Sequence, residues 1–210
     1  MEFVLFFMIS FFCGSCMFSY WIGLLLKKNI REVGDGNPGG ANLIQAAGVK
    51  WGLLGIFLDF MKGFIPTWFL MSKRSMEPAL IPVLLAPILG HAFSPFLRFS
   101  GGKTLAVTFG VWSALTDFKI GFVYAIILFF LLVAFLIMKK GKAPTSVEDS
   151  IQTTTGFLLV GLYLFLNNYS MDYLIFWLCN FLIIFYRQAK NLQEFWRQHW
   201  NKERDREFPV

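Results

Sequence analysis

The sequence predicts an all-α integral membrane protein with seven transmembrane helices and glycine-rich cytoplasmic loops. Of its 210 residues, 56% are hydrophobic and only 15% are charged. The apolar residues gather in runs that approach the roughly 20 residues needed to cross a bilayer, and the basic residues lie mostly between these runs. A water-soluble domain cannot cover so much apolar surface, whereas lipid accepts apolar side chains on every outer face. The composition therefore excludes a soluble enzyme.

Seven apolar runs are interpreted as transmembrane spans. The first follows Glu2 rather than a basic segment, so we expect a retained helix and not a cleaved signal peptide. The third contains Pro82 and Pro87, and the fourth is short. The runs cover residues 3–26, 52–71, 80–96, 105–115, 120–138, 151–166 and 173–186.

We divide the chain into a seven-helix membrane domain, residues 1–186, and a basic cytoplasmic tail, residues 187–210. In the tail, Phe195, Trp196 and Trp200 would share one face of a helix. This spacing among basic residues predicts an amphipathic helix at the membrane surface.

The distribution of Lys and Arg predicts the orientation in the membrane. The connections after spans one, three and five, together with the tail, hold 15 basic residues, whereas the opposite connections hold three: Lys73, Arg74 and Lys119. Cytoplasmic loops carry an excess of basic residues. We therefore expect the N-terminus outside and the C-terminus in the cytoplasm.

Several other functions are not favoured. The net charge is +6, but the basic residues do not follow one face interleaved with aromatics, so no nucleic-acid partner is expected. Cys13 and Cys16 have C-x-x-C spacing, yet they lie within the first apolar run and are interpreted as buried small residues. The sequence has no metal-ligand cluster, and we expect neither a metal nor another cofactor.

The first cytoplasmic loop is rich in glycine. A backbone with so many glycines can turn its N–H groups toward one point, as anion-binding loops do. A flexible connection between helices is the alternative. The loop contains Gly34, Asp35, Gly36, Asn37, Pro38, Gly39, Gly40, Ala41 and Asn42.

A second cytoplasmic loop places Gly101 and Gly102 directly before Lys103, with Arg98 upstream. A lysine beside exposed backbone amides can hold a phosphate; the alternative is an interfacial lysine that only reaches toward water. Both loops belong to the same side of the predicted topology. Together they predict binding of two phosphorylated ligands, or of one large one.

Ionisable residues inside predicted spans are costly in lipid and are usually paired or functional. Asp59 and Lys62 lie three residues apart in the second span, where they can meet on one helix face, and we interpret them as a structural ion pair. His91 lies near the cytoplasmic end of the third span. A structural hydrogen-bonding role and a role in the site both remain open for it.

These residues resemble the bacterial membrane glycerol-3-phosphate acyltransferases that use acyl phosphate, the PlsY family. The family motif G-S-G-N-x-G-A-T-N is similar to residues 34–42, and its D-x-x-K-G-x-x-P element matches Asp59, Lys62, Gly63 and Pro66. Its third element, a basic residue and His followed by N-I-x-R-L, is matched only weakly. The motif H-x-F-P-x-F-L-x-F-x-G-G-K-G agrees at His91, Phe93, Phe96, Leu97, Phe99, Gly101, Gly102 and Lys103, and the weak match covers Arg187, Gln188, Asn191 and Leu192.

The resemblance implies a seven-helix fold in the bacterial cytoplasmic membrane and transfer of a fatty acyl group from acyl phosphate to glycerol 3-phosphate, giving lysophosphatidic acid. The implied partners are these two phosphorylated substrates and membrane lipids. Because acyl phosphate has a good leaving group, the protein needs mainly to hold and align its substrates. Carried over to this chain, the catalytic residues are Lys103, His91, Asn37 and Asp35, and the phosphate-binding residues are Gly34, Gly36, Gly39, Asn42, Arg98, Gly101, Gly102 and Asn191.

The chain departs from the family pattern at charged positions. Asp35 replaces a serine, and a carboxylate about 4 Å from a phosphate would cost on the order of 4 kcal/mol at an effective dielectric near 20 unless a cation such as Lys103 or Arg98 pairs with it. Gln45 replaces an arginine, while Gln188 and Glu194 replace a histidine and an arginine. A catalytically attenuated lipid-binding or interaction protein is therefore the main alternative. A small transporter is disfavoured because the chain shows no inverted repeat.

Overall fold

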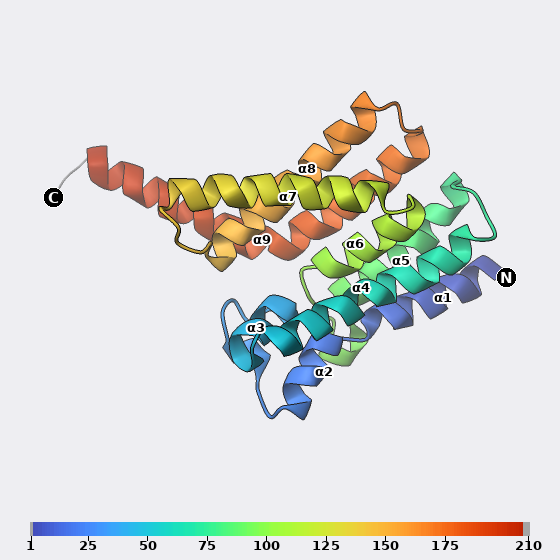
Figure 1. Cartoon of the computed structure of the whole chain (residues 1–210), viewed down its shortest axis with the longest axis horizontal. Helices are drawn as coiled ribbons and strands as arrows, with labels where there is room; N and C mark the ends of the chain where they lie inside the picture. The colour runs from blue at the N-terminus through green and yellow to red at the C-terminus, as the bar shows by residue number, and fades with distance from the viewer. Residues whose placement is uncertain (1, 208–210) are drawn as a thin grey trace.

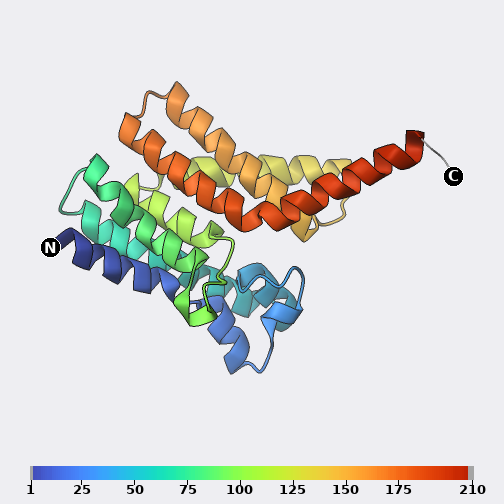
Figure 2. The ribbon, with the colours of Figure 1, turned by 180° about the vertical axis from the view of Figure 1, so that it is seen from behind.

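The computed structural model describes residues 2–207, with side chains described as far as residue 197. Within this range the chain is entirely helical, as the sequence predicts: it forms nine α-helices and three short 3-10 helices, and it has no β-strand. The helices form two groups that lie side by side in both ribbon views (Figure 1, Figure 2). The first group contains α1 (Glu2–Ser15), α2 (Phe18–Leu25), α3 (Gly40–Ala47), α4 (Val49–Met71), α5 (Ile81–Ala92) and α6 (Leu105–Leu115), and the second contains α7 (Lys119–Met138), α8 (Ser146–Leu166) and α9 (Met171–Glu207).

Glycines set the packing inside the first group. A β-carbon on Gly63 of α4 would lie 2.4 Å from the carbonyl oxygen of Val107, and one on Gly110 of α6 would lie 2.1 Å from that of Phe60. Only glycine fits such approaches, so α4 and α6 pack backbone to backbone. This contact fixes the start of α6, which carries the second glycine-rich loop, against the rest of the group.

Aromatic rings join the two groups. Trp112 of α6 packs against Phe176 of α9 with ring centroids 4.9 Å apart, and it packs edge-on against Phe157 of α8 at 6.2 Å. The Trp112 indole N–H also donates to the side-chain oxygen of Asn180 at 3.0 Å. Because these side chains are buried, the two groups share one core.

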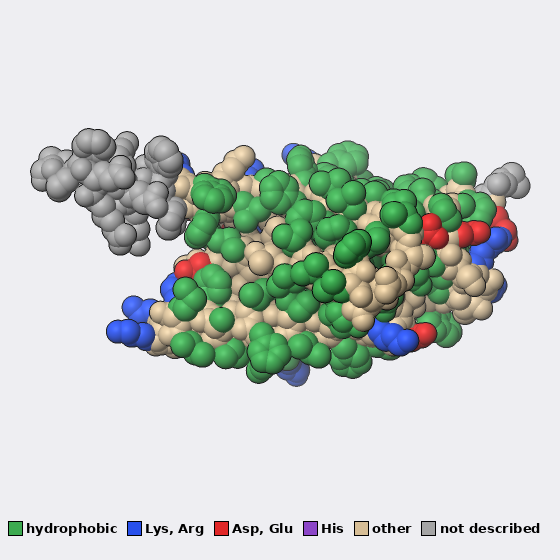
Figure 3. All heavy atoms as spheres, turned by 90° about the horizontal axis from the view of Figure 1, so that it is seen from above, with side chains coloured by type: hydrophobic (Ala, Val, Ile, Leu, Met, Phe, Trp, Pro, Cys, Tyr) green, Lys and Arg blue, Asp and Glu red, His purple; other side chains and the backbone are tan. Residues whose placement is uncertain are grey.

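Four helical stretches in the described chain are long and apolar enough to cross a membrane: Glu2–Leu25, Val49–Met71, Pro78–Leu97 and Lys119–Met138. Leu105–Leu115 is apolar but shorter. The sixth and seventh expected spans lie within α8 and α9, so the number seven stays a prediction. Figure 3 shows hydrophobic side chains across much of one face, as expected of a surface in contact with lipid.

The expectation of one continuous first helix is wrong. The helix breaks between Ser15 and Phe18, where carbonyl groups lose their partners within the helix. The hydroxyl of Ser94 donates to the Ser15 carbonyl at 2.7 Å, and the ammonium of Lys62 donates to that of Cys16. Cys13 and Cys16 are free thiols at this break, near the middle of the Glu2–Leu25 stretch, and both are half-buried rather than buried as expected.

Two further elements differ from the expected layout. The glycine-rich first loop ends in a helix, α3, which the sequence analysis treats as loop. In addition, α9 runs without interruption across the proposed boundary between residues 186 and 187. Phe195 and Trp196 pack edge-on in this helix, while the side chain of Trp200 lies outside the described residues. The membrane-surface placement of the tail stays a prediction.

Candidate functional site

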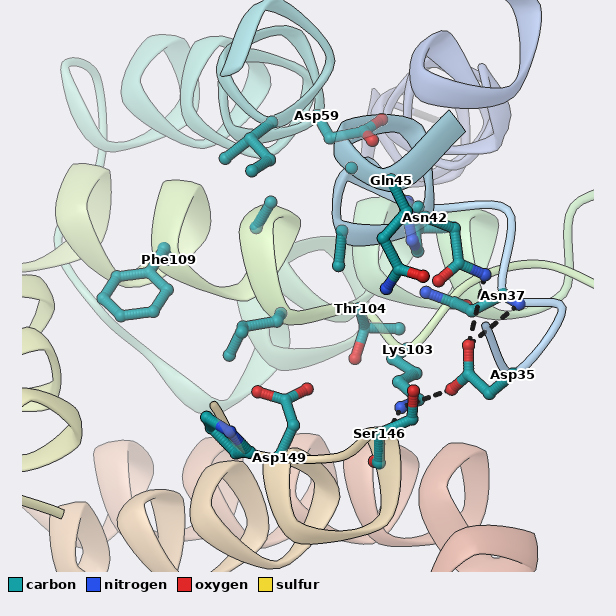
Figure 4. A pocket seen from close by; sticks show the side chains of 18 of the residues that line it. Asp35, Asn37, Asn42, Gln45, Asp59, Lys103, Thr104, Phe109, Ser146 and Asp149 are labelled. Carbon is teal, nitrogen blue, oxygen red and sulfur yellow. Dashed lines mark hydrogen bonds and ion pairs between the residues drawn. The ribbon is translucent and has the colours of Figure 1, made fainter. Parts of the chain in front are cut away.

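A pocket of about 410 Å³ lies where the first glycine-rich loop, the start of α6 and the start of α8 meet. Its wall includes Asp35, Asn37, Asn42, Lys103 and Thr104, several of which Figure 4 shows pointing toward one another. The prediction that both glycine-rich loops lie on the same face is therefore confirmed: their side chains touch. The loop between α7 and α8 also reaches this face.

Three helices begin at the pocket. Gly39, Gly40 and Ala41 line it from the start of α3, Thr104, Leu105 and Ala106 from the start of α6, and Thr145, Ser146 and Asp149 from the start of α8. The N–H groups of a first helical turn have no partner within the helix, and the helix dipole makes this end positive. Three such ends around one pocket favour an anion.

The strongest interaction in the pocket joins the two glycine-rich loops. Asp35 Oδ2 lies 2.6 Å from Lys103 Nζ, and the two side chains are only 15% and 17% exposed. Burial alone raises the pKa of Asp35, but hydrogen bonding to Lys103 and the charge of that lysine outweigh it, so the pKa lies below its usual range. Asp35 is therefore ionised at neutral pH, and Lys103 is the cation that it pairs with.

Asp35 also accepts hydrogen bonds from amide groups of three residues. Its Oδ1 accepts from the backbone N–H of Asn37 and from the side chain of Asn42, both at 3.2 Å, and its Oδ2 accepts from Asn191 at 3.2 Å. Lys103 further donates to Ser150 Oγ at 3.0 Å. The carboxylate thus occupies a site whose surroundings suit a negatively charged oxygen group.

The structure gives Gly101 and Gly102 a role in packing. Their N–H groups donate to the carbonyls of Ala92 and His91 at 3.2 and 3.0 Å, and Arg187 donates to the carbonyls of both glycines. A β-carbon on Gly102 would lie 2.2 Å from His91 Nε2. The argument that these two amides face a phosphate is therefore wrong for this structure, because the end of α5 already takes both of them.

Glycines in the first loop permit its turn. Gly34 and Gly36 have φ values of +58° and +72°, a left-handed conformation that side chains disfavour. This turn lies directly beside Asp35 and carries its carboxylate toward Lys103. Of the predicted phosphate-binding residues in this loop, Gly39 and Asn42 line the pocket.

Two buried polar atoms on the pocket wall have no hydrogen-bond partner among the described residues: His91 Nδ1 and Thr104 Oγ1. The two residues are buried, with exposed fractions of 4% for His91 and 1% for Thr104. Burying an unpaired polar atom is costly, so both atoms are suited to contact a ligand in the pocket. His91 is thus placed with the other predicted site residues.

The two remaining predicted phosphate-binding residues, Asn191 and Arg98, differ in whether they lie at the site. Asn191 meets Asp35 and donates to Ser150 Oγ at 2.9 Å, so it belongs to the network around Lys103. Arg98 is exposed and is not among the residues that line the pocket. The structure therefore gives no support to Arg98 as a phosphate ligand.

The predicted ion pair within the membrane is confirmed. Lys62 Nζ lies 2.8 Å from Asp59 Oδ1, with the side chains 1% and 3% exposed, and the hydroxyl of Ser19 donates to Asp59 Oδ2 at 2.7 Å. The pair fixes α4 to the break between α1 and α2. Asp59 also borders the pocket.

Apolar side chains form one part of the pocket wall: Ile56, Leu105, Ala106 and Phe109. The Phe109 ring is held by stacking on Tyr124, with centroids 4.7 Å apart. The pocket therefore combines a polar part around Lys103 with an apolar part suited to a hydrocarbon chain.

Sequence analysis missed the contribution of α8. Ser146, Asp149 and Ser150 precede the sixth expected span, residues 151–166, and were given no role in the site, yet the first two line the pocket and the third binds Lys103. The sequence did contain an indication. Thr145 and Glu148 form a capping box, in which each side chain binds the other's backbone N–H, and their spacing in the sequence predicts a helix start at this point.

No group of three or more His, Cys, Asp or Glu side chains suited to a metal ion occurs among the residues that the structure describes.

Comparison with known proteins gives a consistent result. The family model described as Glycerol-3-phosphate acyltransferase matches residues 4–198. Glycerol-3-phosphate acyltransferase 1 of Thermotoga maritima is 36% identical over 192 residues, which is 89% of this chain and 94% of the relative. The glycerol-3-phosphate acyltransferase of Aquifex aeolicus is 32% identical over 184 residues, or 87% of this chain and 90% of the relative.

Solved structures show the same fold. The crystal structure of PlsY, an integral membrane glycerol 3-phosphate acyltransferase, in its glycerol 3-phosphate form matches with a TM-score of 0.81 and 26% identity, covering 94% of both chains. The lysophosphatidic acid form of PlsY matches with a TM-score of 0.81 and 27% identity, covering 94% of this chain and 93% of that one.

Proposed function

Because the chain belongs to the glycerol-3-phosphate acyltransferase family, we propose that it transfers a fatty acyl group from acyl phosphate to glycerol 3-phosphate and releases lysophosphatidic acid. The observation that carries the proposal is the pocket itself. Three helix starts and Lys103 surround its polar part, while Ile56 and Phe109 belong to its apolar part. Such a pocket fits one substrate with a phosphate and another with a hydrocarbon chain.

The chemistry asks for alignment more than for activation. The hydroxyl oxygen of glycerol 3-phosphate attacks the acyl carbon, and the bond from that carbon to the phosphate oxygen breaks. Holding both reactants in one pocket removes much of the entropic cost of their encounter. Lys103 and the first-turn N–H groups stabilise phosphate oxygens, and Thr104 Oγ1 and His91 Nδ1 are unpaired groups that can contact the reactants.

The proposal places the pocket on the cytoplasmic side of a bacterial inner membrane. The distribution of basic residues supports this orientation, with the N-terminus outside and the C-terminus inside. Glycerol 3-phosphate would enter from the cytoplasm, and the acyl chain would lie toward the apolar helices. The membrane supplies the lipid partners.

One observation favours the alternative of an attenuated family member. Asp35 occupies the surroundings of Lys103 that a substrate phosphate would need, and neutral Gln45 lines the same pocket. In that case the protein would bind lipid or a partner without turnover. The contact is compatible with turnover as well, because a substrate phosphate can compete with the Asp35 carboxylate for Lys103.

The test is acyl transfer by purified protein in detergent, with labelled glycerol 3-phosphate as acceptor. Acyl phosphate, acyl-coenzyme A and acyl carrier protein thioester are supplied as separate donors. We expect labelled lysophosphatidic acid from acyl phosphate. Folded protein that forms no product from any donor would favour the attenuated alternative, whereas product from a thioester alone would keep the acyltransferase activity and overturn the proposed donor.

A further inference from the structure

Two arginines bind the second glycine-rich loop directly before Lys103. The three consecutive carbonyl oxygens of residues 100–102 accept hydrogen bonds from them. Arg31 Nη2 donates to the first carbonyl at 2.5 Å, and Arg187 donates through Nη2 to the second and through Nε to the third, the latter at 3.1 Å. Neither arginine is among the residues that line the pocket. Both therefore contact the loop that carries Lys103 and not the pocket itself.

The two arginines come from distant parts of the chain. Arg31 lies in the short 3-10 helix Ile30–Glu32, which precedes the first glycine-rich loop, and its guanidinium lies over the Tyr20 ring, 5.5 Å from the centroid. Arg187 lies in α9, and its guanidinium lies 5.9 Å from the centroid of the Phe93 ring at the end of α5. Cations are attracted to aromatic faces at such distances. The second glycine-rich loop is thus fixed both to the first loop and to the last helix.

Both guanidinium groups interact with the loop rather than with acidic side chains. Among the described residues, neither Arg31 nor Arg187 forms an ion pair with a carboxylate. Burial lowers the pKa of Arg187, and the charge of Arg31 lowers it further, so the two cations are close enough to repel each other. Placing two like charges beside one turn is unfavourable, and the hydrogen bonds to three carbonyls offset it.

The loop needs such support because its backbone is strained on both sides of the bound carbonyls. Phe99 and Thr104 have φ values of +60° and +67°, in the left-handed region that residues with a β-carbon adopt only uncommonly. Strained conformations of this kind persist where the surrounding structure holds them in place. The two arginines bind the segment between the strained residues, next to Lys103.

Two contacts join the first glycine-rich loop and its flank to the second loop. Asp35 Oδ2 lies 2.6 Å from Lys103 Nζ, a contact that Figure 4 shows at the pocket. Arg31, which precedes the first loop, binds the Ser100 carbonyl of the second. In the proposed reaction a substrate phosphate competes with Asp35 for Lys103, which opens the first contact. The second contact involves no residue of the pocket wall, so a ligand in the pocket does not compete for it.

We propose that Arg31 and Arg187 are positioning residues for phosphate binding: they hold residues 100–102 so that Lys103 Nζ stays directed into the pocket when the substrate displaces Asp35. The lysine ammonium sits on a flexible four-carbon stem, so its location depends on the backbone that carries it. This inference rests on the proposed function and adds to it two residues that act through Lys103 without touching the substrate.

The test measures affinity, turnover and folding separately. Affinity for glycerol 3-phosphate is measured by isothermal titration in one detergent, kcat and KM by acyl transfer from acyl phosphate, and folding by thermal unfolding. Each of the two arginines is replaced by Gln and, separately, by Lys: Arg31→Gln, Arg31→Lys, Arg187→Gln and Arg187→Lys. The matched control is Arg74→Gln, because Arg74 is a partly exposed arginine whose partners, Glu2 and Glu77, lie beyond the far end of α4.

We expect Arg31→Gln and Arg187→Gln each to weaken binding of glycerol 3-phosphate by roughly ten- to a hundredfold, at most the loss of the Lys103 contact itself. The kcat should stay near that of wild type, because a phosphate contact is made in the ground state and the transition state alike. Lysine should restore most of the affinity at position 31, where one N–H group donates, but not at position 187, where a fork of two donors binds two carbonyls. Arg74→Gln should match wild type.

A double-mutant cycle shows whether Arg31 acts through Lys103. In the Lys103→Ala background, Arg31→Gln should change affinity by less than about threefold, since the lysine that it positions is gone. A further loss of tenfold or more would overturn the inference, because a merely structural role gives additive effects. Wild-type affinity of both folded Gln variants would also overturn it.

The Lys variants keep the charge and carry the test if a Gln variant fails to fold. Full recovery of affinity in Arg187→Lys would overturn the inference, since charge alone and not the position of the loop would then account for binding. Wild type that binds glycerol 3-phosphate but transfers no acyl group would overturn the proposed function alone. Wild type that does not bind glycerol 3-phosphate would overturn both.

Discussion

The molecule contains two Asp–Lys pairs of nearly equal length in different surroundings. The Asp59–Lys62 pair spans 2.8 Å within α4, with both side chains at most 3% exposed. The Asp35–Lys103 pair spans 2.6 Å, joins two loops and retains 15% and 17% exposure. The first pair is held by α2 through Ser19 and only Asp59 of it reaches the pocket wall, whereas both residues of the second pair line the pocket.

The difference shows that distance alone does not tell a structural pair from a functional one. In the buried pair each charge depends on the other, because neither can recover its hydration. In the pocket pair a ligand anion can take the place of Asp35, and water can solvate the displaced carboxylate. We therefore assign the buried pair to folding and the pocket pair to substrate binding.

The largest effect is expected from breaking the buried pair. Lys62→Ala leaves the Asp59 carboxylate without its cation and should lower the free energy of unfolding by about 3–5 kcal/mol. Thermal unfolding in detergent measures the change, with Lys50→Ala, an exposed lysine, as the control. A double variant, Asp59→Leu with Lys62→Met, should recover much of the loss. Wild-type stability of Lys62→Ala would remove the structural role.

The next effect is on ligand affinity. Lys103→Ala should weaken binding of glycerol 3-phosphate by roughly ten- to more than a hundredfold, since a charge-assisted contact contributes about 1.5–3 kcal/mol. Folding should persist because Asp35 keeps its amide donors. Titration in one detergent compares this variant with Lys119→Ala, which removes an exposed lysine at the start of α7. Equal affinities would remove Lys103 from the phosphate site.

A gain of function is expected at the partner of Lys103. Asp35→Ser removes a carboxylate that competes with phosphate and supplies a hydroxyl donor, so the KM for glycerol 3-phosphate should fall by about tenfold, an estimate of the same order as one charged contact. Steady-state kinetics at fixed acyl phosphate measures it. If turnover falls instead, Asp35 has a positive role in the reaction.

The smallest effect is expected when both partners are changed in the pocket pair. If Asp35 acts only by competing for Lys103, then Asp35→Ser should improve affinity in wild type but hardly at all in the Lys103→Ala background. A double-mutant cycle of the binding free energies isolates this coupling. Additive effects would show that Asp35 repels the phosphate independently of the ion pair.

Much of the fold followed from the sequence because lipid imposes long apolar runs, which can be located in the sequence by their length. The buried pair was also predictable, since Asp59 and Lys62 lie three residues apart on one helix. The break after Ser15 was not, because the groups that satisfy its carbonyls, Ser94 and Lys62, are far away in sequence.

The site was predictable only in part. Lys103 and Asp35 were identified, and their pairing was one of the alternatives. The backbone N–H groups of Gly101 and Gly102, however, were expected to be free for a phosphate, whereas they donate to carbonyls at the end of α5. Asp149 escaped notice because nothing local distinguishes it from an ordinary acidic residue in a first helical turn. Only the meeting of α8 with two distant loops gives its carboxylate a place in the pocket.

The most direct test of the central claim is a crystal structure of the protein bound to glycerol 3-phosphate. We predict that the ligand phosphate contacts Lys103 Nζ at the starts of α3 and α6, and that the Asp35 carboxylate has moved away from the lysine. A bound glycerol 3-phosphate elsewhere, with the 2.6 Å contact between Asp35 and Lys103 still intact, would contradict the assignment of this pair to substrate binding.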